Sequence, residues 1–238
     1  MKFRHVRTAG LGIVLVLLLS SGAWAQAVLQ TVTVRVKPGK MSSYQEKITA
    51  LQGVMDRVGG GSRVQVWNAT LAGTGAGNTL VSVAYPSLEA YADITRKASA
   101  DEEWQKIMGG LDDIRTIVSN GLIESRDGGG VPAAVESGAV LQGVLVRVEP
   151  GKLGTYLERI EALKKVQERV GATGTTRVWQ ATLSGEATGT VAVGLTHPSL
   201  AAFAENSGKL QADAEWQKLI AGLDSVRTIV SSSLFVAP

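Results

Sequence analysis

The stretch Val34-Arg35-Val36-Lys37-Pro38-Gly39-Lys40 decides the fold, because it returns 112 residues later as Val146-Arg147-Val148-Glu149-Pro150-Gly151-Lys152. Residues 27–125 and 139–237 align at this offset without a gap, and roughly half of the aligned positions are identical. A repeat of about 100 residues is the size of a whole small domain. The sequence therefore predicts two copies of one domain.

Each copy has the same predicted order of elements. In the first copy, residues 29–37 alternate between apolar and polar and predict a strand, which ends at Pro38-Gly39. Helical spacing follows as far as residue 58, with Ser42 or Ser43 as the expected N-cap. The remaining predicted elements are strands over 63–71, 79–85 and 114–122, a glycine-rich loop over 73–78, and helices that begin after Ser87 and Asp101.

The order β-α-β-β-α-β predicts an α+β fold of the ferredoxin-like type. Apolar residues occupy both alternation phases of the strands, so the face of the sheet opposite the helices must also be covered. We expect the two ferredoxin-like repeats, residues 26–125 and 139–238, to pair their antiparallel sheets within one chain as a barrel. Residues 126–138 form a Gly/Pro linker, and thirteen extended residues span up to ~43 Å, which is enough for this pairing.

The first 25 residues resemble a signal peptide. Lys2, Arg4 and Arg7 precede an apolar run over 11–19, and Ala23-Trp24-Ala25 offers a small-x-small cleavage pattern. Cleavage predicts a mature start at Gln26 or Val28 and a periplasmic or secreted protein. The alternative is an uncleaved membrane anchor, for which the apolar run is short.

Composition restricts the partners. Without the three basic residues of the leader, the remaining Lys and Arg equal the 21 Asp and Glu in number. A nucleic-acid-binding protein would need a clustered basic face, so we expect no nucleic-acid partner. No later apolar run is long enough to cross a bilayer, so we expect no membrane contact after cleavage. Because the chain has no cysteine, thiolate metal sites and cysteine nucleophiles are excluded.

The motifs resemble one family. A strand, a Pro-Gly-Lys turn, a helix with a tyrosine in its first turn, and later Asp101-Glu102-Glu103-Trp104-Gln105-Lys106 are similar to the dimeric α+β barrel superfamily, closest to NIPSNAP-like and antibiotic-biosynthesis-monooxygenase-like domains. The resemblance implies that two such sheets close into a barrel, here as a fused tandem pair. Its cofactor-free oxygenases imply Asn and Trp together in an apolar pocket, whereas this chain has Trp67-Asn68 in one copy and Gln180 after Trp179 in the other.

Histidine content argues against metal and haem chemistry. Haem-binding relatives in this superfamily use a histidine on a helix, and neither copy has one. His5 lies in the leader, and His197 stands at a strand end where the first copy has Tyr85, which favours an amphipathic packing role. We therefore expect no cofactor and no metal site.

Four pairs of equivalent residues are the candidate ligand-binding positions. Each pair is open to a packing interpretation: core filling for the tryptophans and tyrosines, rim salt bridges for the arginines. The functional alternatives are an aromatic wall of a pocket between sheet and helices and an arginine grip on a carboxylate or enolate. The candidates are Trp67 and Trp179, Arg35 and Arg147, Arg115 and Arg227, and Tyr44 and Tyr156.

Two classes of function remain open. The first is a non-catalytic protein that binds a small apolar or carboxylate-bearing ligand or another protein, with the repeats paired internally and a homodimer as a further assembly. The second is a cofactor-independent, monooxygenase-like enzyme acting on a small aromatic or enolisable substrate. A shared fold does not choose between them, although the missing catalytic motifs favour the first.

Overall fold

The computed structural model describes residues 26–238, so the predicted signal peptide lies outside the described residues. The fold is a mixed α+β fold, as predicted, and consists of eight antiparallel strands and six α-helices in this part of the chain. Over residues 26–238, no helix has the length and apolarity that a membrane span needs.

The first half, residues 26–125, follows the predicted order, with the second helical region split in two. The strands are β1 (Val28–Val36), β2 (Arg63–Leu71), β3 (Thr79–Tyr85) and β4 (Arg115–Ser125). The helices are α1 (Met41–Val58), α2 (Leu88–Ser99) and α3 (Glu102–Gly109), with the single turn η1 (Gly73–Gly75) between β2 and β3.

The second half, residues 139–238, has the same order of elements. Its strands are β5 (Val140–Val148), β6 (Thr175–Leu183), β7 (Val191–His197) and β8 (Arg227–Val236). Its helices are α4 (Leu153–Arg169), α5 (Leu200–Gln211) and α6 (Ala214–Leu223), and the single turn η2 (Gly185–Ala187) lies between β6 and β7.

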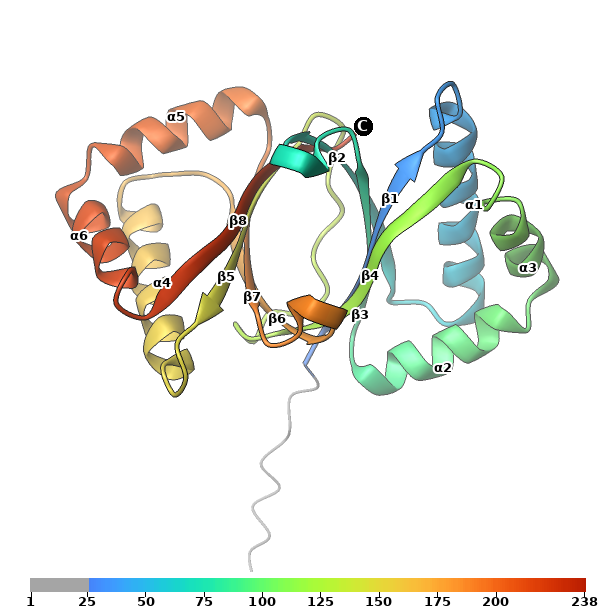
Figure 1. Ribbon diagram of the computed structural model, residues 1–238, viewed down its shortest axis with the longest axis horizontal. Helices are drawn as coiled ribbons and strands as arrows, with labels where there is room; N and C mark the ends of the chain where they lie inside the picture. Colours follow the sequence, from blue (N-terminus) through green and yellow to red (C-terminus); the bar gives the residue numbers. More distant parts are fainter. Residues whose placement is uncertain (1–25) are drawn as a thin grey trace, which may run out of the picture.

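The eight strands close into one barrel in the order β1-β3-β2-β8-β5-β7-β6-β4 (Figure 1). The two halves join twice, where β2 pairs with β8 and where β4 pairs with β6. The helices of each half cover the outside of their own sheet, on opposite sides of the barrel in Figure 1. The face of each sheet that is opposite its helices therefore lines the interior of the barrel.

Strand alternation divides the core between these two faces. Val34 of β1 and Val81 of β3 pack with Tyr44 and Leu51 of α1 in the helix–sheet core of the first half. The opposite phase places Trp67 with Ala139 and Phe235, and Trp179 with Ile123, at the barrel side. This explains why both phases of the strands are apolar.

Two of the three predicted helix caps are present. The side chains of Ser87 and Asp101 accept hydrogen bonds from the backbone N–H groups of Ala90 and Trp104, as N-caps do. The prediction for α1 was wrong, because that helix begins one residue before the serines and Lys40 at its N-cap makes no side-chain cap bond. Lys40 instead closes the Pro-Gly turn through its N–H, which donates to Lys37 O at 3.0 Å.

The segment between the halves is held across the barrel. The amide of Gln65 donates to Ala133 O at 2.7 Å from one side, and the guanidinium of Arg177 donates to Gly130 O at 2.9 Å from the other. Gln65 and Arg177 are equivalent positions of the two halves. Residues 126–138 are drawn as the irregular yellow-green segment that crosses the barrel opening in Figure 1.

Candidate functional site

Two of the cavities within residues 26–238 lie on opposite faces of the second sheet. The helix–sheet cavity has a volume of about 140 Å³ and lies between the second sheet and helices α4 and α6. The barrel cavity has a volume of about 240 Å³ and lies inside the barrel, with both halves in its wall. Each cavity contains some of the candidate residues.

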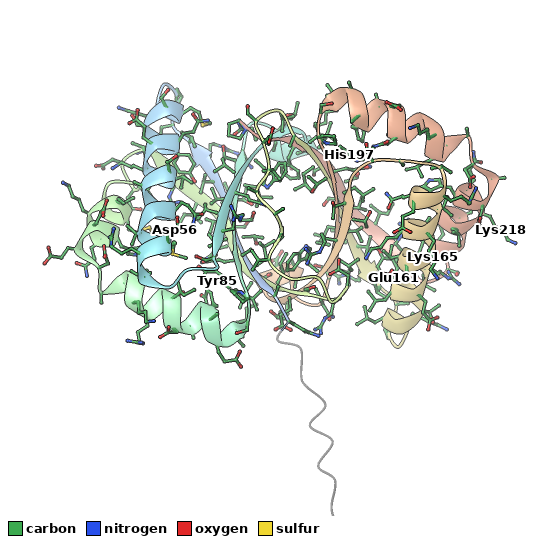
Figure 2. All side chains as sticks on the ribbon, turned by 180° about the vertical axis from the view of Figure 1, so that it is seen from behind. Asp56, Tyr85, Glu161, Lys165, His197 and Lys218 are labelled. Atoms are coloured by element: carbon green, nitrogen blue, oxygen red, sulfur yellow. The ribbon has the colours of Figure 1, made fainter. Side chains whose placement is uncertain are left out.

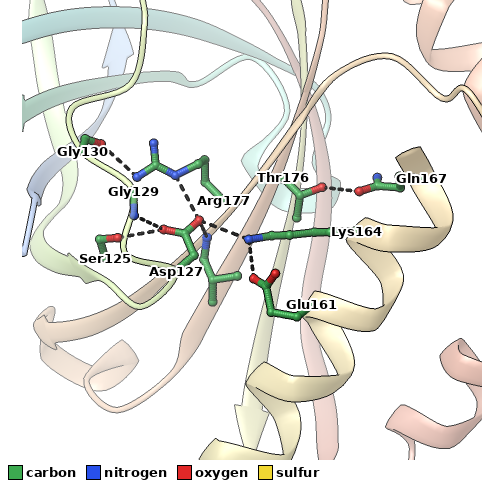
Figure 3. Close-up of polar contacts among 10 residues, drawn as sticks. Ser125, Asp127, Gly129, Gly130, Glu161, Lys164, Gln167, Thr176 and Arg177 are labelled. Carbon is green, nitrogen blue, oxygen red and sulfur yellow. Dashed lines mark hydrogen bonds and ion pairs between the residues drawn. The ribbon is translucent and has the colours of Figure 1, made fainter. Parts of the chain in front are cut away.

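The helix–sheet cavity combines apolar walls with a few polar groups, which is typical of small-molecule sites. Its apolar walls come from Val144, Ile160, Leu163, Val193, Leu195, Trp216, Ile220 and Leu223. Its polar groups are Gln142, Tyr156, Gln167, Thr176 and Arg227. The Thr176 hydroxyl donates a hydrogen bond of 2.7 Å to Gln167 Oε1 (Figure 3).

Tyr156 and Arg227 are the titratable pair of this cavity. Tyr156 is fully buried in the first turn of α4, and Arg227 begins β8 opposite Val148. Burial raises the pKa of Tyr156 to about 12, although the nearby positive charge of Arg227 lowers it in part. The hydroxyl is therefore protonated at neutral pH and can only donate to an anion, while Arg227 supplies the positive charge.

The first half has two apolar residues where the second half has the Gln167–Thr176 pair. Offset by 112 positions, Gln167 and Thr176 correspond to Met55 and Val64. Met55 is 1% exposed and packs among Tyr85, Ile94 and Ala98, while Val64 packs against the helix–sheet core. The polar pair is thus a property of the second half alone.

Tyr44 and Arg115 are the first-half counterparts of Tyr156 and Arg227, and both are buried. Burial raises the pKa of Tyr44, and the neighbouring Arg115 guanidinium lowers it in part. Neither the Tyr44 hydroxyl nor Arg115 Nε has a hydrogen-bond partner within normal distance in the described structure. These two residues are close in space and enclosed by apolar side chains.

The first-strand and fourth-strand arginines do not form one cluster. In the register of β1 and β4, Arg35 lies opposite Thr116 and Arg115 opposite Val36, which places the two arginines on opposite faces of the sheet. Arg35 and Arg147 are exposed and line neither cavity. Arg35 Nε instead donates to Asn78 Oδ1 at 3.4 Å.

Trp67 and Trp179 lie on the opposite face of the sheet from the one expected for an aromatic pocket. Both line the barrel cavity rather than a pocket against the helices, because their strand phase points inward. They are 2% and 5% exposed. The Arg177 guanidinium lies 5.1 Å from the ring centre of Trp179, a cation–π distance.

His197 packs as its Tyr85 counterpart does, and Figure 2 labels both residues, one in each half of the molecule. Its ring meets Phe203 edge-on at 5.4 Å, and Tyr85 meets Tyr91 edge-on at 5.1 Å. Nδ1 lies 3.0 Å from the Asn206 amide nitrogen, so Nδ1 accepts that hydrogen bond. Burial lowers the pKa of His197, and the ring lines neither cavity.

Haem, which the resembled superfamily binds in some of its members, does not fit the helix–sheet cavity. A volume of about 140 Å³ is close to that of a cavity that holds benzene, far below what a porphyrin needs. The only histidine among residues 26–238 is His197, which is outside this cavity. Within the same range, no cluster of three or more His, Asp or Glu side chains is placed to hold a metal ion.

Several residues that line the helix–sheet cavity were not predicted from the sequence. Trp216, Gln142, Gln167 and Thr176 were not among the candidate residues, yet all four line the helix–sheet cavity. The signal was present in the differences between the repeats, where Met55 becomes Gln167 and Val64 becomes Thr176. Identity between the copies identified the framework, and departures from identity identified the site.

Comparison with known proteins supports the fold. Neither protein-family models nor curated protein sequences match the chain. Among solved structures, candidate monooxygenases of Fusobacterium nucleatum and Lactobacillus acidophilus share 13% and 7% identity, with TM-scores of 0.58 and 0.59. Each covers 90% of this chain, over 94% and 93% of its own length. An anthrone oxidase-like protein, at 16% identity and a TM-score of 0.58, covers 90% of this chain over 91% of its own. The chain is therefore similar to ferredoxin-like α+β proteins in fold.

Proposed function

We propose that the protein is a cofactor-independent, monooxygenase-like enzyme and that a small aromatic or enolisable substrate reacts in the helix–sheet cavity. The observation that carries the proposal is the pairing of Arg227 with the buried, protonated Tyr156 in a mostly apolar cavity. A cation and a hydroxyl donor in such surroundings stabilise an oxyanion strongly. The monooxygenase-like fold neighbours support the same class of reaction.

The chemistry needs only the chain, the substrate and dioxygen. An enolisable C–H substrate loses a proton to water, and the Arg227 charge and the Tyr156 O–H stabilise the enolate oxygen. The enolate carbon then forms a bond to O₂ and gives a hydroperoxide after proton uptake. Loss of water from the hydroperoxide leaves a new carbonyl, so one oxygen atom enters the product and the other leaves as water.

The polar pair Gln167 and Thr176 fixes the substrate in this scheme. The Gln167 amide nitrogen is free to donate while its oxygen accepts from Thr176 at 2.7 Å. Gln142 on β5 adds a second amide. The pair thus orients a substrate oxygen relative to Arg227, as binding sites with few polar groups do.

A non-catalytic ligand-binding protein is the second candidate, and one observation favours it. No polar group that lines the helix–sheet cavity is a base at neutral pH, because the pKa of Tyr156 is raised to about 12 and the others are an arginine, two amides and a hydroxyl. A substrate for the enzyme must therefore ionise readily by itself. A ligand that only binds has no such requirement.

Oxygen uptake separates these candidates. The monocyclic diketone 1,3-cyclohexanedione suits the cavity volume, and anthrone serves as a larger comparison. The enzyme proposal predicts protein-dependent O₂ consumption and a lowered pKa of the bound diketone, read from its enolate absorbance. Enolate stabilisation without O₂ uptake would favour the binding protein. If the protein caused neither O₂ uptake nor enolate stabilisation, both assignments at this cavity would be overturned.

We also propose that the chain arose as a fused pair of ferredoxin-like domains, which form within one chain the barrel that two subunits form in the resembled family. The constant offset of 112 residues and the shared order of elements support this proposal. Export to the periplasm or medium is a further proposal, supported by the leader pattern over residues 1–25. Assembly of the protein into a homodimer is also a proposal.

A further inference from the structure

We infer that the barrel cavity is a second binding site, separate from the helix–sheet cavity, for a neutral aromatic molecule of about two fused rings. The walls are mainly apolar and come from both halves, with Trp67 on β2 and Trp179 on β6. A cavity of roughly 150 Å³ lined by apolar side chains holds benzene. The volume of about 240 Å³ therefore suits a larger, bicyclic ring system.

A pair of glycines creates part of this space. Gly143 of β5 and Gly194 of β7 lie directly opposite each other in the register, and both line the cavity. The first half has Thr31 and Ser82 in the equivalent places, which also form a register pair. Ala192, which also lines the cavity, is equivalent to Leu80 of the first half, so the second half again has the smaller side chain.

The backbone does not require glycine at these two positions. Neither has a positive φ. A Cβ at Gly143 would lie 3.4 Å from the Phe235 ring, and a Cβ at Gly194 would lie 3.2 Å from a terminal methyl of Leu141. Small movements of these two side chains would therefore make room for a larger residue. Glycine inside a strand weakens it and often marks a place where a ligand approaches the backbone closely. The glycine pair therefore leaves room for a ligand at some expense to the strands.

The segment between the halves closes one mouth of this cavity. Pro132 is part of the wall, and the strap formed by residues 127–133 is bound at Gly130 by Arg177 and at Ala133 by Gln65. Figure 3 shows Arg177 and Ser125 meeting Asp127 at the start of the strap. The charge of Arg177 is balanced by Asp127 Oδ2 at 3.0 Å, which is why a neutral ligand fits better than an anion.

The test uses the whole chain and 4-fluoroindole, whose binding is followed by fluorine NMR. We expect saturable binding to the wild type and at least tenfold weaker binding to Gly194→Ser, which carries the first-half residue. Ala192→Leu is the second filling variant, in case the first does not fold, and near-ultraviolet circular dichroism monitors the fold of both. The double variant Gln167→Met with Thr176→Val closes the other cavity and should leave this binding unchanged.

The outcomes separate the two cavities. Loss of fluoroindole binding only in the Gln167→Met, Thr176→Val variant would place the ligand in the helix–sheet cavity and overturn the inference. Unchanged binding in folded Gly194→Ser and Ala192→Leu, or no binding to the wild type, would also overturn it. Oxygen uptake by the wild type is read separately, so failure of the proposed enzyme activity is distinguishable from failure of this site.

Discussion

The hydroxyl of Thr176 donates a 2.7 Å hydrogen bond to Gln167 at a place where the first half has Val64 and Met55. Met and Val pack against an apolar cavity better than a polar pair does, so packing alone does not explain the polar pair. Its presence in one half only indicates that the halves share a framework and differ in role. The first half therefore supplies matched controls for the second-half site: Arg115 is the counterpart of Arg227.

The first prediction concerns Arg227. Arg227→Gln should lower kcat/KM of the oxygenase reaction about 100-fold, as loss of one oxyanion-stabilising group does. Steady-state O₂ uptake measures the effect. Arg115→Gln is the matched control in the first half: it should leave kcat/KM unchanged, although it changes the buried surroundings of Tyr44. Equal loss of activity in both variants would argue for a general structural effect.

The second prediction concerns the two barrel tryptophans. Trp67→Ala and Trp179→Ala should each lower the free energy of unfolding by about 3–5 kcal/mol if the ring serves only as core. If part of the ring surface faces the cavity, as the lining indicates, the loss should fall below this range and fluoroindole affinity should drop. Urea melts and fluorine NMR on the same variants give both quantities. A full core-sized loss with unchanged fluoroindole affinity would identify these residues as packing alone.

The third prediction concerns Asp127, whose carboxylate is 3% exposed. Burial alone would raise its pKa, but the Ser125 hydroxyl, the Arg177 charge and the backbone N–H groups of Gly129 and Val178 hold the pKa below its usual value. A depressed pKa in the folded state means that the ion contributes stability above pH about 4 and that this contribution is lost as the pH falls further.

Asp127→Asn should therefore cost about 1–3 kcal/mol of unfolding free energy at pH 7, because buried partners lose a charged acceptor. Urea melts between pH 7 and pH 3 should show the difference from wild type shrinking on acidification. The control is Glu161→Gln, because Glu161 binds the same Lys164 at 2.7 Å but is 54% exposed and should matter little. A difference that stays constant with pH would contradict the assigned role of the carboxylate.

The fourth prediction concerns the leader. Mass spectrometry of protein from the native host should find a mature chain that begins at Gln26 or Val28, since small residues precede both positions. Recovery of chains that retain Met1 in the mature pool would remove the export proposal. Expression in the host without residues 1–25 gives the size standard for this comparison.

Much of the fold could be predicted from one sequence because its signals are local. Alternation over residues 29–37 and the Pro38-Gly39 turn predict the strand and its end, and the observed strand is Val28–Val36. Ser87 and Asp101 cap their helices as expected. The cap of α1 was missed, because the backbone turn at Lys40 begins the helix before either serine. Local signals also gave no account of which sheet face holds a cavity.

The candidate site was less predictable because it depends on side chains that meet across distant elements. Trp67 was recognised as an aromatic of interest, but its face was assigned incorrectly, since the phase of a strand is known only once the helices are placed. Arg115 and Arg35 were candidates of the same kind, but their register positions put them on opposite faces of the sheet. Gln167 has no local signal and is recognised only against Met55 of the other half.

The most direct test of the central claim is protein-dependent O₂ uptake with 1,3-cyclohexanedione, measured for the wild type and for the double variant Gln167→Met, Thr176→Val. The variant gives the second half the first-half residues at these positions, so the protein should remain folded while the polar anchor is lost. The account predicts uptake by the wild type and at least a tenfold lower rate for the variant. Equal rates in the two proteins would contradict the assignment of the reaction to the helix–sheet cavity.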